Sequence, residues 1–135
     1  LVRYATNGLY IENADSSGYD SSFSGSLALK KGLKVCKSGI TTGQTCGEYQ
    51  HTEQAGLLGN GLVKAIIYGP DGETLSDKGD SGSPWYTQSL PRRLVAIHWG
   101  GNPNNGDVSY ATPWTEVADK YGLSLYESST PTLIN

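Results

Sequence analysis

The 135-residue sequence lacks several features that would mark particular classes of protein. It contains no methionine, two cysteines and two histidines, and charged residues make up only 17% of it. No apolar run approaches the roughly 20 residues that span a bilayer, which argues against an integral membrane protein. Ten basic residues against thirteen acidic ones give a net charge of −3, with no basic stripe. Phosphate binding needs such a stripe, so nucleic acid is not an expected partner.

The start of the chain lacks the usual marks of a newly translated protein. The sequence begins at Leu1, inside an apolar stretch with no turn or cap before it, and it shows no signal peptide. We therefore expect a processed or excised chain. Its length suits one ordinary domain.

Glycine and large aromatic residues are abundant. Eighteen glycines stand beside nine Tyr, three Trp and one Phe. Short runs alternate with turn signals such as the PDG of residues 70–72 and the NPNNG of residues 102–106. This pattern is typical of an antiparallel barrel or sandwich. The predicted runs are 26–29, 32–38, 62–68, 83–86, 94–99 and 108–111.

One helix is predicted near the end of the chain. Pro113 suits a first-turn position, and apolar residues follow it at a 3.6-residue period as far as Tyr121. Gly122 then provides a stop signal. We expect the residues at 127–135 to form a loose tail.

The two cysteines, Cys36 and Cys46, lie ten residues apart. A metal site would need further Cys or His at ligand spacing, and only His51 and His98 are present. A catalytic thiol would leave the second cysteine unexplained. A disulfide across a hairpin is the economical interpretation, and it indicates an oxidising, secreted setting. No cofactor and no metal site are expected.

The residues that bear chemistry are 79–84, with the sequence GDSGSP. A serine hydroxyl between glycines can lie on a tight turn whose backbone approaches a substrate. The amides of Gly79 and Ser81 would then converge to form an oxyanion hole, while a buried, paired Asp80 would hold the turn. An ordinary Gly-Asp-Ser surface turn is the alternative interpretation. His51 matches no motif.

Residues 79–84 resemble the nucleophile motif of chymotrypsin-fold serine proteases, and three further stretches match in the same order. Residues 35–47 resemble the disulfide hairpin of the streptogrisin and α-lytic protease group. Residues 95–101 resemble the strand lining the specificity pocket, and residues 111–125 the closing strand and C-terminal helix. The resemblance implies an all-β, antiparallel Greek-key barrel of the chymotrypsin-like fold, mainly the C-terminal barrel, with a short C-terminal helix. It assigns residues 1–126 to this barrel, including an inter-barrel segment at the start.

A second resemblance concerns the substrate. Residues 97–101, with the sequence IHWGG, are similar to the corresponding stretch of secreted glutamyl endopeptidases. In that family the His at this place hydrogen-bonds the carboxylate of a Glu side chain, and a hydroxyl five residues before the nucleophile assists it. A satisfied core imidazole is the alternative role for the His. The substrate-binding residues implied by the resemblance are Ser76, His98, Trp99, Gly100 and Gly101.

A serine nucleophile needs a general base, and the base needs an orienting carboxylate. In the resembled families this His and Asp lie on the N-terminal barrel, and the stretch at Leu1 resembles the segment just after that Asp. We therefore expect a secreted serine endopeptidase that acts on peptides or proteins, preferring an acidic residue before the cut. Its His and Asp would come from a missing N-terminal part or a separate chain.

Two alternatives to that interpretation stay open. One is a non-catalytic secreted binding or effector module derived from the same fold. The other is a dyad in which His98 acts as the base to Ser81, at the expense of its role in the pocket.

Overall fold

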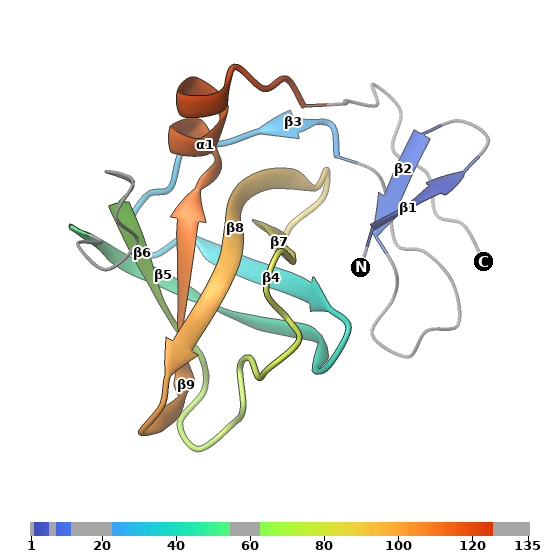
Figure 1. Cartoon of the computed structure of the whole chain (residues 1–135). Helices are drawn as coiled ribbons and strands as arrows, with labels where there is room; N and C mark the ends of the chain where they lie inside the picture. The colour runs from blue at the N-terminus through green and yellow to red at the C-terminus, as the bar shows by residue number, and fades with distance from the viewer. Residues whose placement is uncertain (1, 6–7, 12–22, 55–62, 126–135) are drawn as a thin grey trace.

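The computed structural model describes residues 2–5, 8–11, 23–54 and 63–125 (Figure 1). The predicted tail at 127–135 lies outside these residues. Two short strands, β1 (Val2–Ala5) and β2 (Gly8–Ile11), pair with each other in a separate antiparallel sheet. The described residues include no helix that is long and apolar enough to cross a membrane.

Six antiparallel strands close into a barrel, which confirms the predicted fold class (Figure 1). Their spatial order is β8-β7-β4-β5-β6-β9, and β9 returns to pair with β8. A short strand, β3 (Gly25–Ser26), adds a parallel pair to β8. The barrel strands are β4 (Lys34–Gly39), β5 (Gly43–Gln54), β6 (Val63–Tyr68), β7 (Pro84–Thr87), β8 (Arg93–Asn102) and β9 (Asn105–Pro113).

The strand β5 was not among the predicted runs. Its twelve residues are mostly polar or glycine, so no apolar run marks it in the sequence. It is held by pairing with β4 on one side and β6 on the other, with a register shift between Tyr49 and His51. The run at 26–29 extends beyond its strand, because β3 ends at Ser26.

The disulfide and the helix are confirmed. Cys36 and Cys46 face each other directly in the β4–β5 register and are bonded. The helix α1 (Trp114–Tyr121) begins after Pro113, which takes the N-cap position, and ends at Gly122 in the left-handed conformation. A left-handed residue at this point suits glycine, because a side chain would be strained there.

The barrel interior is filled by apolar side chains from most of its strands. Trp85 is the largest fully buried side chain, and Leu75 enters from the connection between β6 and β7. This connection is tied to the barrel by the Leu75 amide, which donates to the Gly106 carbonyl at 2.9 Å. The main core cluster consists of Val35, Ile67, Leu75, Trp85, Val95, Ala96 and Ala111.

Candidate active site

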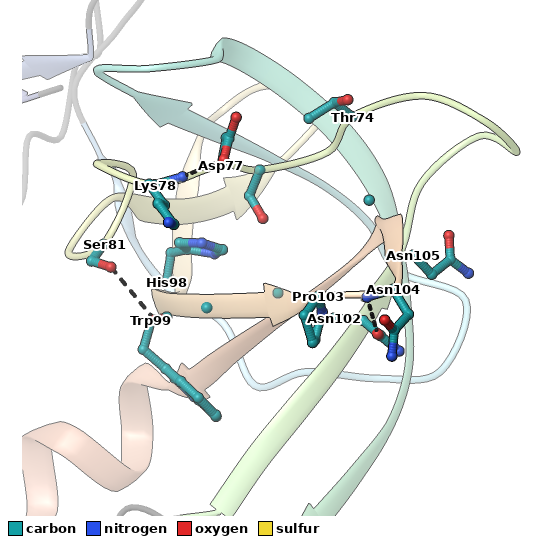
Figure 2. A pocket seen from close by; sticks show the side chains of 14 residues that line it. Thr74, Asp77, Lys78, Ser81, His98, Trp99, Asn102, Pro103, Asn104 and Asn105 are labelled. Atoms are coloured by element: carbon teal, nitrogen blue, oxygen red, sulfur yellow. Dashed lines mark hydrogen bonds between the residues drawn. The ribbon is translucent and has the colours of Figure 1, made fainter.

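Ser81 lies on a tight turn at the end of the β6–β7 connection. The amide of Asp80 donates to Asp77 O at 3.1 Å, and the amide of Ser83 donates to Asp80 O at 3.0 Å, so two turns follow each other. The hydroxyl of Ser81 is exposed and donates to the Trp99 carbonyl at 3.5 Å (Figure 2). The nucleophile candidate is thus presented at the surface beside β8.

Glycine is required at position 79 for two reasons. Its φ is +100°, a conformation that L side chains rarely adopt. A Cβ added there would also collide with Oγ1 of Thr41, at the tip of the β4–β5 hairpin. Gly82 also has a positive φ of +87°, but a Cβ there would meet nothing within 4 Å.

The amides of Gly79 and Ser81 donate no hydrogen bond to the part of the chain that the structure describes. The neighbouring amides do, because Asp80 bonds to Asp77 and Gly82 donates to His98 O at 2.8 Å. Within this turn, the two amides predicted as oxyanion donors are therefore available to a ligand.

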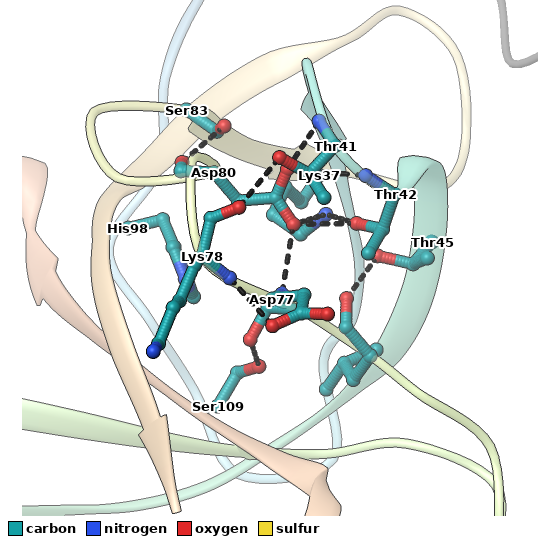
Figure 3. Close-up of polar contacts among 12 residues, drawn as sticks. Lys37, Thr41, Thr42, Thr45, Asp77, Lys78, Asp80, Ser83, His98 and Ser109 are labelled. Carbon is teal, nitrogen blue, oxygen red and sulfur yellow. Dashed lines mark hydrogen bonds and ion pairs between the residues drawn. The ribbon is translucent and has the colours of Figure 1, made fainter.

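Asp80 is fully buried, and its carboxylate lies among polar groups of the β4–β5 hairpin (Figure 3). Its carboxylate accepts hydrogen bonds from Thr42 Oγ1 at 2.6 Å, from the Thr41 amide at 2.9 Å and from the Asp77 amide at 3.0 Å. Burial alone would raise the pKa of Asp80. The hydrogen bonds from Thr42, Asp77 and Thr41, together with the charge of Lys37, outweigh burial and hold that pKa far below its ordinary value.

Lys37, on β4, is the buried counter-ion of Asp80. Its Nζ lies 3.4 Å from Asp80 Oδ2 and donates to Thr42 Oγ1 at 2.6 Å, and its side chain is fully buried. Burial lowers the pKa of Lys37, while the Asp80 charge opposes that shift. The turn that carries Ser81 is therefore anchored by groups from within this chain.

A pocket of about 620 Å³ opens beside Ser81 (Figure 2). Its walls come from residues 74 and 76–78 of the β6–β7 connection and from residues 98–106 of β8, β9 and the turn between them. The charged side chains on its walls are Asp77 and Lys78. The structure brings all of the predicted substrate-binding residues to this one pocket, namely Ser76, His98, Trp99, Gly100 and Gly101.

Ser76 and Gly101 meet at one wall of the pocket. The Ser76 hydroxyl shares a 2.5 Å hydrogen bond with the hydroxyl of Ser109, which is buried on β9. A Cβ at Gly101 would lie 3.2 Å from Ser76 Oγ, so a larger residue there would press on this hydroxyl.

His98 is nearly fully buried, with 2% of its surface exposed. Its Nδ1 accepts a hydrogen bond from Trp85 Nε1 at 3.2 Å, and its amide donates to Ser83 O at 2.9 Å. Burial, assisted by the charge of Lys37 and opposed by that of Asp80, lowers the pKa of His98 to about 4. The imidazole is therefore neutral at neutral pH.

Neither histidine hydrogen-bonds Ser81 in the described structure. His51 is exposed on β5, with its Nε2 3.0 Å from Glu53 Oε1. The Nδ1 of His98 is engaged by Trp85. The arrangement gives no support to a dyad in which His98 serves as the base. The described residues also hold no group of three or more His, Cys, Asp or Glu side chains that could bind a metal ion.

Sequence reasoning missed two side chains that shape this site, Lys37 and Trp85. The signal for Lys37 was a single cation in the middle of a strand that is otherwise buried, because a charge there needs an opposite charge beside it. Trp85 carried no such signal. A tryptophan in a buried strand is an ordinary core residue, and the sequence alone does not show which group accepts the hydrogen bond of its indole N–H.

Comparison with known proteins places these observations in context. No protein-family model matches the sequence. Streptogrisin-C of Streptomyces griseus is 29% identical over 133 residues, which cover 95% of this chain and 28% of that protein. An uncharacterized protein of Mycobacterium tuberculosis is 32% identical over 103 residues, or 73% of this chain and 41% of that protein. The chain thus spans less than half the length of these curated relatives.

Solved structures agree with the fold. Thermobifida fusca protease A superposes with a TM-score of 0.63 at 27% identity, over 86% of this chain and 60% of that one. Nocardiopsis protease gives a TM-score of 0.60 at 19% identity, over 97% and 70% of the two chains. Cellulomonas bogoriensis chymotrypsin gives 0.60 at 23%, over 93% and 67%. The chain therefore has the fold of the chymotrypsin-like serine proteases, and its sequence is similar to streptogrisin-C and to Thermobifida fusca protease A.

Proposed function

We propose that this chain supplies the nucleophile, the oxyanion donors and the primary substrate pocket of a serine endopeptidase that cleaves after acidic residues. The observation that carries the proposal is a single pocket lined by three groups. They are the exposed hydroxyl of Ser81, the buried neutral imidazole of His98 and the hydroxyl of Ser76. The similarity to solved structures that are named proteases supports peptide-bond hydrolysis as the class of reaction.

In the proposed reaction, Ser81 Oγ attacks the scissile carbonyl carbon and its proton passes to a general base. The amides of Gly79 and Ser81 stabilise the resulting oxyanion, and the base returns the proton to the leaving amine as the C–N bond breaks. Neither histidine among the described residues hydrogen-bonds Ser81. We therefore propose that a His and an Asp come from an N-terminal part of the protein or from a separate chain.

The pocket chemistry favours a carboxylate side chain. An imidazole N–H and a hydroxyl can both donate to a carboxylate without the desolvation penalty of a buried permanent cation. Lys78 adds a positive charge to the pocket wall. Asp77 places a negative charge on the same wall, and its Oδ1 accepts a hydrogen bond from the Lys78 amide at 2.7 Å. The disulfide supports an extracellular location, where oxidising conditions preserve such a bond.

The test is a substrate panel on the native protein that contains this chain. Matched peptides with Glu, Gln, Phe or Arg before the cut should be cleaved fastest when that residue is Glu. His98→Ala should reduce the preference for Glu over Phe by about tenfold or more, as for loss of a buried hydrogen bond to a charge. His51→Ala is the control, since that imidazole lies on the surface of β5. Equal cleavage of all four peptides would reject the acidic pocket.

A second candidate function is a non-catalytic secreted binding or effector module. The observation that favours it is that neither histidine hydrogen-bonds Ser81. Under this candidate, the native protein would show no hydrolysis of any peptide in the panel and no reaction of Ser81 with a fluorophosphonate. Peptide mapping of the labelled protein by mass spectrometry separates the two functions.

A further inference from the structure

Trp85 and His98 form a buried pair behind the pocket. Trp85 lies on β7 and is fully buried, and His98 lies on the neighbouring antiparallel strand β8. Their ring centroids are 6.0 Å apart, with the planes tilted by 51°, and the Trp85 Nε1 to His98 Nδ1 distance is 3.2 Å. The same imidazole lines the pocket (Figure 2).

The hydrogen bond between these rings fixes where the imidazole proton sits. An indole N–H can only donate, so Nδ1 of His98 must present a lone pair. A neutral imidazole carries one proton, which is therefore on Nε2. The opposite tautomer would set two N–H groups against each other in the core and leave both without a partner, which is costly in a buried site.

The same bond also disfavours the imidazolium. Both ring nitrogens of a protonated histidine are donors, so protonation would break the contact with Trp85. Burial and the nearby Lys37 act in the same direction, whereas Asp80 opposes them. His98 is thereby held as a neutral ring with one acceptor engaged in the core and one N–H left for the pocket.

We propose that Trp85 is a positioning residue for substrate selection, which holds His98 in the Nε2–H tautomer so that the pocket offers a fixed donor to the substrate carboxylate. This rests on the function proposed above. Trp85 touches no substrate in this account and acts only through His98. A carboxylate is then bound by a neutral imidazole, with no proton transfer to the ring.

The experiment is long-range ¹H–¹⁵N NMR of the histidine rings in the native protein with labelled histidine, before and after Trp85→Phe. The substitution keeps a buried aromatic ring and removes the N–H. His98→Gln and His51→Gln identify the signals of these two residues among those of the native protein, and the exposed His51 provides an internal reference. Trp114→Phe, in α1, controls for loss of an indole elsewhere. Near-UV circular dichroism checks that each variant is folded.

We expect wild-type His98 to show the Nε2–H pattern and Trp85→Phe to move it toward Nδ1 protonation, while Trp114→Phe leaves it unchanged. The ratio of kcat/KM for Glu over Phe peptides should fall about fivefold to tenfold in Trp85→Phe at pH 8, the worth of one oriented hydrogen bond. The loss should appear mainly in KM for the Glu peptide, with the Phe peptide cleaved as before.

The wild-type spectrum tests the proposal even if Trp85→Phe does not fold. A wild-type His98 with its proton on Nδ1, or one charged at neutral pH, would overturn it. So would a Trp85→Phe protein with an unaltered His98 signal and unaltered selectivity. An Nε2–H tautomer in a wild-type protein without acidic preference would instead reject the proposed function, and with it the role of Trp85 in selection.

Discussion

The buried pair of Lys37 and Asp80 leads to unequal effects of two single substitutions. Asp80→Asn removes the negative charge and leaves the Lys37 ammonium in the core, with Thr42 Oγ1 as its other described partner. Breaking a buried pair in this way costs about 3–5 kcal/mol. Lys37→Met is milder, because the Asp80 carboxylate keeps its donors from Thr41, Thr42 and Asp77. We expect it to cost about 1–3 kcal/mol.

The assay is urea unfolding at pH 7 of the two single variants and the double variant. The double variant should be less destabilised than the sum of the singles, because it leaves no uncompensated charge. Lys34→Met is the matched control on the same strand. Lys34 is exposed and paired with Glu48 at the surface, so its loss should change stability by less than about 0.5–1 kcal/mol. Equal costs for the two single variants, or strict additivity, would refute the reasoning.

Three further outcomes are expected. The pKa of His98 is about 4 in the folded chain and 6.5 for an ordinary histidine, so the unfolded chain binds the proton at a higher pH than the folded one. The free energy of unfolding should therefore fall by about 2–3 kcal/mol from pH 7 to pH 4.5. His98→Gln should abolish that part of the fall in urea titrations, and an unchanged slope would contradict it. Replacing Cys36 and Cys46 by Ser should cost about 2–3 kcal/mol in the same titrations, from the entropy of a ten-residue loop; reductant should then have no further effect. Gly79→Ala should slow fluorophosphonate labelling about tenfold or more. It should also destabilise the fold more than Gly82→Ala, because a Cβ at position 79 would collide with Thr41 whereas one at position 82 has open space.

The architecture was predictable from the sequence where local signals were strong. Pro113 and Gly122 bracket α1, and the spacing of Cys36 and Cys46 suits the facing positions that they occupy on β4 and β5. The polar strand β5 was not predictable in this way. Its place is set by the two strands that flank it, and no single-strand pattern records such pairing.

The candidate site was predictable as a set of residues and less so as a network. The motif around Ser81 and the stretch containing His98 were visible, and both line one pocket. Their supporting partners were not visible, because they come from other strands. Lys37 is 43 positions from Asp80, and Trp85 reaches His98 across the β7–β8 pair. Such contacts join residues that are far apart in the sequence or on different strands, so they become apparent only in the folded structure.

The reaction of Ser81 with an acidic substrate analogue tests the proposed function most directly. The direct measurement is the rate at which peptide diphenyl phosphonates, with Glu or Phe at the position before the phosphorus, modify the native protein. Mass-spectrometric mapping then locates the adduct. The account predicts one adduct, on Ser81, formed several-fold faster by the Glu compound, as expected for one buried hydrogen bond to a charged group. An absent adduct, an adduct on another residue, or equal rates for the two compounds would contradict it.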